Sequence, residues 1–136
     1  MAPVIPRLIL TAFILAHALI HVAFLGPRPP ATAGGPPWPF DLGHSWILDP
    51  LGVRSEQARL VGTALVAITL GGFALASVAA LGLGPQGLWL AAAAVGSVGS
   101  LALLIAYFHP WLLLGVAIDL GLIWSVLILG WTPQGL

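Results

Sequence analysis

The sequence predicts an all-α protein, a four-helix transmembrane bundle with a long Pro-rich connection between helices 1 and 2. Of its 136 residues, 60% are hydrophobic and 6% are charged, whereas a soluble domain carries about 25% charged residues. Four apolar stretches each approach the roughly 20 residues that a helix needs to cross a hydrocarbon layer of about 30 Å. A chain of this length forms one domain, so we expect a single integral membrane domain over residues 1–136.

Helix-breaking residues separate the apolar stretches. The second and third are divided by a Gly-Pro-Gln-Gly turn at residues 84–87, and the third and fourth by His109-Pro110, because proline disfavours helix at the residue before it. Connections this short make neighbouring helices antiparallel. The expected helices run approximately over residues 8–25, 60–83, 88–108 and 111–131.

The connection between the first and second helices is long and rich in proline. Six prolines between Gly26 and Asp41 keep this segment out of regular helix. Ser55 followed by Glu56 is typical of an N-cap with an acid in the first turn, which predicts the start of the second helix. Residues 42–48 are expected to lie at the membrane interface.

Two of the expected helices carry small residues at four-residue spacing. Such stripes let the backbones of neighbouring helices approach closely inside a membrane. We therefore expect these faces to be packing surfaces. They consist of Gly72, Ala76 and Ala80 on the second helix and of Ala92, Gly96 and Ser100 on the third.

The composition excludes several classes of function. Four arginines balance four acidic residues, so the chain has no basic surface to bind a nucleic acid. The absence of cysteine excludes disulfides, thiolate metal ligation, covalent c-type haem and cysteine-bound iron–sulfur clusters. No lysine is present, so a retinal Schiff base cannot form on this chain. Redox chemistry would therefore need a cofactor that is bound in another way.

The histidines gather toward one side of the membrane. We call the side that holds the N-terminus side A and the opposite side B. Four crossings place the Pro-rich connection, with His44, and the turn at His109 on side B. His21 lies about one turn from the side-B end of the first helix and His17 one turn deeper. All four histidines thus fall in the side-B half, which is the most informative feature of the sequence.

One acidic residue lies within an apolar stretch. Asp119 is about 12 Å inward from Trp111 at ~1.5 Å per residue, and His17 lies at nearly the same depth. An acid there costs about 2.5 kcal/mol or more to insert, so it should face the bundle interior and be protonated or paired. Gly115, on the same face, lets a neighbouring helix approach beside the acid. We therefore expect Asp119 and His17 to form a proton-handling or structural pair.

Three roles stay open for the histidines: hydrogen bonding across helices, ligation of a cofactor, and proton transfer. His17 and His21 are four residues apart and share one helical face. The candidate ligands of a haem b are His17, His21 and His109, and those of a metal ion are His17, His21 and His44. A quinone in the same region is the third cofactor considered. His44 and His109 are also explained as interfacial or capping residues.

The first helix resembles that of a known family, the DoxX-like proteins, which are small four-helix prokaryotic membrane proteins. The resemblance is carried by Arg7-Leu8-Ile9-Leu10, Phe13-Ile14-Leu15-Ala16 and His17-Ala18-Leu19-Ile20-His21. It implies a four-helix membrane fold and roles for Arg7 and His17. Because some members are associated with quinone-linked sulfur oxidation or with redox partners, it also implies a redox setting.

Two classes of function follow. The first is a redox-linked subunit that binds haem, a metal ion or a quinone at the histidine cluster near one membrane face. The second is a non-enzymatic transporter, or an accessory subunit of a membrane complex, that uses the pair of Asp119 and His17. Whether the chain is an enzyme stays open. The expected partners are the lipid bilayer and other membrane subunits, and the expected location is a prokaryotic plasma membrane.

Two points of topology also stay open. Arg28, Arg54 and Arg59 on the side-B connection outnumber Arg7 on side A, which favours a cytoplasmic side B. A lone Arg7 ahead of an apolar helix fits the opposite orientation equally well. A secretory signal is the competing interpretation of the first stretch, because residues 31–33, Ala-Thr-Ala, resemble a cleavage site. The length of the stretch and its two histidines favour a helix that stays in the protein.

Overall fold

A computed structural model describes residues 4–85 and 87–135, and within these ranges the chain is helical, with no strand. The four long helices are α1 (Val4–Ile20), α2 (Ser55–Ala80), α3 (Leu88–Ala106) and α4 (Leu113–Ile123). Helix α1 continues as the 3-10 helix η1 (His21–Leu25), and α4 is preceded by the 3-10 helix η3 (Pro110–Leu112) and followed by the π-helix η4 (Trp124–Ile128). With these extensions, four helical segments are long and apolar enough to cross a membrane, as judged by length and composition.

The observed helices differ from the expected ones mainly at their ends. Helix α1 begins at Val4 rather than near residue 8, because a proline in the first turn, here Pro6, removes no intrahelical hydrogen bond. Helix α2 begins at Ser55, and its N-cap is Arg54 rather than Ser55. The backbone N–H of Arg54 donates to Oε1 of Gln57 at 3.3 Å. Of the expected turn between α2 and α3, Gln86 lies outside the described residues.

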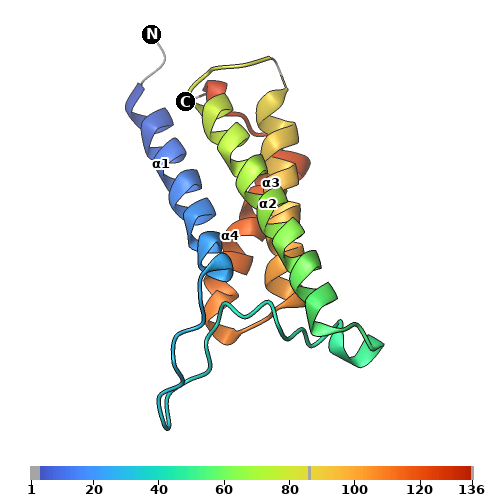
Figure 1. The fold of residues 1–136 in the computed structure, drawn as a ribbon. Coiled ribbons are helices and arrows are strands. Elements are labelled where there is room, and N and C mark those ends of the chain that lie inside the picture. Colours follow the sequence, from blue (N-terminus) through green and yellow to red (C-terminus); the bar gives the residue numbers. More distant parts are fainter. Residues whose placement is uncertain (1–3, 86, 136) are drawn as a thin grey trace.

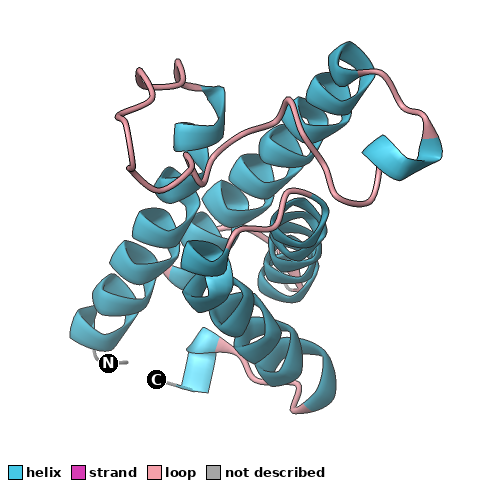
Figure 2. Cartoon of the chain, turned by 90° about the horizontal axis from the view of Figure 1, so that it is seen from below, coloured by secondary structure: helices cyan, strands magenta, loops and turns pink. Residues whose placement is uncertain are grey.

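The helices run up and down, and the short connections join antiparallel neighbours (Figure 1). Helix α1 packs mainly on α2, α2 packs on α3, and α3 packs on α4. The start of α1, the end of α2, the start of α3 and the last 3-10 helix, η5 (Pro133–Gly135), lie at one end of the molecule, side A (Figure 1). The long segment of residues 26–54 and the turn between α3 and α4 lie at the other end, side B (Figure 1). Figure 2 shows the molecule from this second end.

Helices α2 and α3 make the closest contact, through the small residues expected to pack. A Cβ atom on Gly72 would lie 2.5 Å from both Cα and N of Gly96, and 3.1 Å from the carbonyl oxygen of Ala92. A Cβ atom on Gly96 would lie 3.0 Å from the backbone nitrogen of Phe73. Only hydrogen fits at these two positions, so the two glycines set the distance between the helices.

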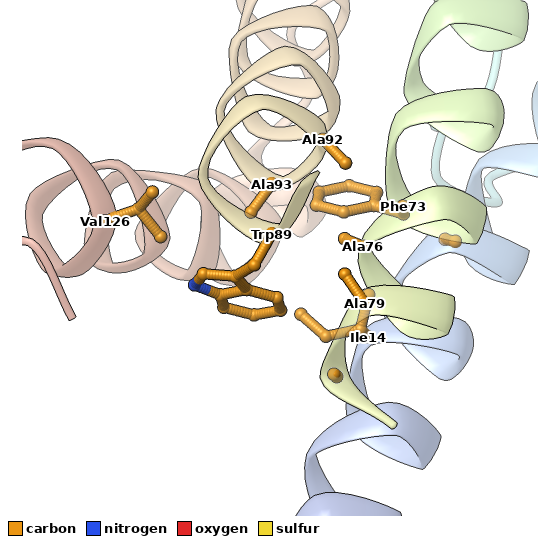
Figure 3. Packing of buried hydrophobic residues seen from close by; sticks show 10 residues of the cluster. Ile14, Phe73, Ala76, Ala79, Trp89, Ala92, Ala93 and Val126 are labelled. Carbon is orange, nitrogen blue, oxygen red and sulfur yellow. The ribbon is translucent and has the colours of Figure 1, made fainter. Parts of the chain in front are cut away.

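The side-A half of the interior is an apolar cluster. Figure 3 shows Phe73 of α2 and Trp89 of α3 packed with Ile14 of α1 and with small alanines of α2 and α3. Phe73 and Ile14 are fully buried, and the Trp89 Nε1–H donates to the carbonyl oxygen of Trp131 at 3.0 Å. Val126 of η4 and Leu122 of α4 also pack in this cluster. It therefore joins all four helical segments and fixes the depth of the residues on its side-B flank.

Residues 26–54, which we call the connecting segment, contain one short 3-10 helix, η2 (Asp49–Leu51). The segment is attached to the side-B ends of the helices. Ser45 Oγ donates to the carbonyl oxygen of Ala106 at 2.6 Å, and Trp46 Nε1 donates to that of Ile105 at 2.5 Å. These bonds satisfy carbonyl groups at the end of α3 that have no partner within the helix. Leu42 is buried in a second apolar cluster, at the side-B end, together with Phe24 and Tyr107.

Candidate functional site

His17 and His21 project from α1 toward the middle of the bundle, and both are buried. Their rings meet edge to face with centroids 5.2 Å apart. The Nδ1–H of His21 donates to the carbonyl oxygen of His17 at 3.0 Å. Helix α1 becomes a 3-10 helix at His21, where backbone pairing shortens from i→i+4 to i→i+3. This change makes the carbonyl of His17 available to the side chain of His21.

Asp119 lies on α4, has no exposed surface, and is held by groups from two other helices. Nε2 of His17 lies 2.9 Å from Asp119 Oδ1, and the Ser100 hydroxyl of α3 lies 2.5 Å from Oδ2. The same hydroxyl lies 2.7 Å from Nε2 of His21. The structure thus brings together the expected pair, Asp119 and His17. It adds Ser100 and His21 to form a continuous chain, which we call the histidine–aspartate network.

Gly115 explains how α4 comes close enough to present the acid. It lies one turn from Asp119 on the same helical face. A Cβ atom on Gly115 would lie 2.8 Å from Cδ1 of Leu104 on α3 and 3.8 Å from Cε1 of His17. An alanine at this position would require the end of the Leu104 side chain to shift, so Gly115 leaves room for Leu104 beside the acid.

The donors and acceptors of the network determine how many protons it holds. Its three links, His17–Asp119, Asp119–Ser100 and Ser100–His21, each need one hydrogen. A neutral His17 supplies one from Nε2, and the serine hydroxyl supplies another. The Nδ1 hydrogen of His21 is used on a carbonyl oxygen, which can only accept. The third link therefore needs one further proton, either on the carboxyl of Asp119 or on Nε2 of His21.

Both proton positions leave the network without net charge. In one form Asp119 is a neutral acid that donates to Ser100, which donates to His21. In the other form His21 is an imidazolium that donates to Ser100, which donates to the Asp119 carboxylate. Burying an unpaired charge in an apolar interior costs several kcal/mol or more, so a neutral, fully bonded network is the stable state. The two forms differ only by hydrogen shifts along the bonds of one chain.

A cavity of about 130 Å³ lies beside the network, between α1 and α4. His17 and His21 are its polar groups, and the other walls are apolar, including Phe24, Phe40 and Trp111. An apolar protein cavity of about 150 Å³ can hold a benzene molecule. The cavity thus has room for about one six-membered ring.

The other two candidate histidines lie away from the network. Nδ1 of His109 accepts from the backbone N–H of Trp111 at 3.2 Å, at the turn between α3 and α4. His44 is exposed on the connecting segment, where its Nδ1 lies 3.0 Å from Asp41 Oδ2. Both contacts are local, so these residues act as capping and loop residues in the structure.

The geometry brings some of the candidate metal and haem ligands together and leaves others apart. Among residues 4–85 and 87–135, no three His, Asp or Glu side chains are grouped to hold a metal ion, so His44 does not join His17 and His21. Three of the four ring nitrogens of His17 and His21 already form hydrogen bonds within the protein. The cavity beside them holds about one ring and is lined by Trp111 rather than by His109. The structure therefore places His17 and His21 together and leaves His109 at the turn between α3 and α4.

Two polar residues fall outside the roles that the sequence indicated. Ser100 was expected only as a packing residue, yet it links both histidine contacts to Asp119. Arg7, which the family resemblance singles out, lies at the side-A end of α2, where Nη1 would be 2.9 Å from a Cβ atom on Gly82. A cation at the C-terminal end of a helix is favourable, so the surroundings of Arg7 fit a structural role.

Comparison with known proteins does not place the chain in a family. It matches no protein-family model, no curated protein and no solved structure.

Proposed function

We propose that this chain is a small integral membrane protein that holds and transfers a proton through the histidine–aspartate network, as a transporter or as an accessory subunit of a membrane complex. The observation that carries the proposal is the continuous chain of buried hydrogen bonds from His17 through Asp119 and Ser100 to His21. Chains of ionisable groups inside a membrane bundle are typical of proton relays.

The outer surface supports a position in the bilayer. Large apolar side chains are exposed along all four long helices, for example Ile9 at 64%, Leu60 at 73%, Val98 at 53% and Leu114 at 73%. Soluble monomers rarely expose continuous apolar patches larger than a few hundred Å². The lengths of the four helical segments fit a hydrocarbon layer of about 30 Å. Lipid is therefore the partner that this surface fits best.

Proton transfer needs a group that can hold the proton in two places. The network supplies two, Asp119 and His21, on opposite sides of the Ser100 hydroxyl. It also supplies a fixed geometry, because each member comes from a helix that the apolar cluster and the two glycines of α2 and α3 hold in place.

Proton flux in proteoliposomes tests this proposal. The chain is reconstituted with a trapped pH-sensitive dye, and a proton gradient is applied together with a membrane potential. We expect Asp119→Asn to lower the flux by about tenfold or more, since general proton-transfer groups contribute roughly 10²-fold or more. Glu56→Gln, an exposed acid at the start of α2, is the matched control. Equal flux in Asp119→Asn and in the unsubstituted protein, with both proteins folded, would overturn the proposal.

The cavity favours a second candidate, a redox-linked subunit that binds a quinone head group beside the network. One six-membered ring fits the volume of about 130 Å³, and both histidines face it. A bound quinone would supply two-electron redox chemistry, while His17 and His21 would orient its ring and hold protons. The DoxX-like resemblance and a prokaryotic plasma membrane remain predictions that agree with this candidate.

Quinone binding is tested with a short-chain quinone added to the purified protein. Trp111 lines the cavity, so a bound ring should quench its fluorescence in a saturable way. We expect Ile118→Trp, which fills the cavity from α4, to abolish the saturable quenching. Leu120→Trp, an exposed position on the same helix, is the control. Linear, non-saturable quenching in the unsubstituted protein would rule this candidate out.

A further inference from the structure

A second cavity lies next to the cavity beside the histidines. It has a volume of about 240 Å³, lies nearer to side B and is lined by residues of η1, the connecting segment and α2. Its polar lining consists of Arg28, Asp41, Arg59 and Thr63. This lining is mostly polar, whereas the histidine cavity has walls that are mostly apolar. We call the second cavity the side-B vestibule.

Phe24 and Phe40 line both cavities and therefore form the wall between them. Their rings are perpendicular, with centroids 5.2 Å apart. Phe24 is buried on η1, one turn beyond His21, and Phe40 is carried by the connecting segment. The indole of Trp38 packs edge to face on Phe40 at 5.5 Å between centroids. The wall is thus made of one ring fixed to a helix and one ring that belongs to a loop.

The loop side of the wall is held by a cluster of polar contacts around Asp41, next to Phe40. The Asp41 carboxylate accepts from the backbone N–H of Gly43 at 2.8 Å, and it lies 3.3 Å from Arg28 Nη1 and 3.0 Å from His44 Nδ1. Partial burial of this carboxyl acts to raise its pKa. The hydrogen bonds from Gly43 and His44 and the charges of His44 and Arg28 outweigh that effect, so the pKa of Asp41 lies below its usual range. Asp41 is therefore ionised at neutral pH and anchors Phe40.

We infer that the histidine–aspartate network communicates with side B alone, through the vestibule, and that the pair of Phe24 and Phe40 is the barrier on this route. The inference rests on the proposed function, because it assigns the access path of the proton. Water reaches the vestibule freely, and movement of Phe40 with the connecting segment joins the vestibule to the histidine cavity. On side A the interior is closed by the apolar cluster around Phe73 and Trp89, which offers a proton no comparable path.

Cysteine accessibility tests the route without relying on proton flux. The sequence holds no cysteine, so a single Ile118→Cys places the one thiol of the protein in the histidine cavity. The full-length chain is reconstituted, and a membrane-impermeant, cationic methanethiosulfonate is added to one side at a time. We expect slow labelling from side B and none from side A. Phe40→Ala should speed labelling by roughly tenfold, because it removes the aromatic contact that closes the wall.

Two controls keep the result interpretable. Phe108→Ala removes an exposed aromatic ring at the same end of the molecule and should leave the labelling rate unchanged. Phe40→Leu keeps an apolar side chain of similar length and should give an intermediate rate, which covers the case in which Phe40→Ala fails to fold. Labelling from side A would overturn the inference, and so would equal labelling rates whether Phe40 is kept or replaced by leucine or alanine. Since labelling needs no proton transfer, this outcome is separate from the flux result for Asp119→Asn.

Discussion

Ser100 is the residue that joins two separate contacts into one network. His17 meets Asp119 at one carboxylate oxygen, and His21 reaches the other oxygen only through the Ser100 hydroxyl. A hydroxyl can donate and accept at the same time, so it passes a hydrogen shift from one neighbour to the other. The ability of the network to hold its proton at two positions therefore depends on this side chain.

Replacement of Ser100 by alanine should lower both the stability of the folded protein and the proton flux. Ser100→Ala leaves Asp119 Oδ2 and His21 Nε2 without their partner, and a buried polar group left unpaired costs about 1–3 kcal/mol. Ser97→Ala is the matched control on the same helix, because the buried Ser97 Oγ has no hydrogen-bond partner among the described residues. Thermal unfolding in detergent and the liposome flux assay measure both effects. Equal melting temperatures and equal proton fluxes for the two alanine variants would contradict the proposed role of Ser100.

At the scale of elements, the contact between α2 and α3 is the rigid part of the bundle. Gly72 and Gly96 face one another so closely that a methyl group on either would meet backbone atoms. Ser100 lies one turn beyond Gly96 on the same face of α3, so the spacing of the two helices also sets the position of the serine. Backbone atoms cannot move aside as a flexible side chain can.

The effect of replacing a glycine of this hairpin on stability should therefore depend on the helical face that the glycine occupies. We expect Gly96→Ala to lower the melting temperature by several degrees, because overpacking a tight interior typically costs about 1–3 kcal/mol. Gly71→Ala lies in the same α2–α3 hairpin but has no atom within 4 Å of the added methyl. It should be neutral or stabilising by up to about 1 kcal/mol, since alanine favours helix over glycine. A smaller decrease in melting temperature for Gly96→Ala than for Gly71→Ala would show that this contact does not hold the two helices together.

The attachment of the connecting segment to the helices should weaken at acidic pH. The folded pKa of Asp41 lies below its ordinary value of 3.8, so its contribution is fully present above about pH 3.8 and is lost as the pH falls through the folded pKa. A nitroxide label on Ala31→Cys reports the mobility of the segment. We expect low mobility at neutral pH and a rise below about pH 3.8. Asp41→Asn should be mobile at every pH, and mobility of the unsubstituted segment that does not change between neutral pH and about pH 3 would contradict this prediction.

The sequence predicts some of these elements and not others, for physical reasons. The four helices and the pairing of His17 with Asp119 follow from hydropathy and from depth along a helix, which are local properties. The role of Ser100 depends on how α3 is rotated toward α1 and α4, which tertiary packing decides. The docking of the connecting segment through Ser45 and Trp46 onto the end of α3 depends in the same way on contacts between distant residues.

At the scale of the whole molecule, the start of α1 at Val4 and the final 3-10 helix, residues Pro133–Gly135, lie at the same end of the helices, side A (Figure 1). The prediction is that single cysteines at Gln134 and at Ala31 react with an impermeant thiol reagent from opposite sides of the same membrane. Both positions are exposed, so a lack of reaction cannot be attributed to burial. Reaction of both from one side would mean that the four apolar helices do not each cross the bilayer.

The most direct test of the central claim is a proton inventory of the histidine–aspartate network. Infrared spectroscopy detects the carbonyl stretch of a protonated carboxyl, and nitrogen NMR of ¹⁵N-histidine protein distinguishes neutral rings from an imidazolium. We expect one of two signatures, both removed by Asp119→Asn: a buried neutral carboxyl, or an imidazolium at His21 beside an ionised Asp119. An ionised Asp119 beside two neutral histidines would mean that one link lacks its hydrogen, and the network could not share a proton.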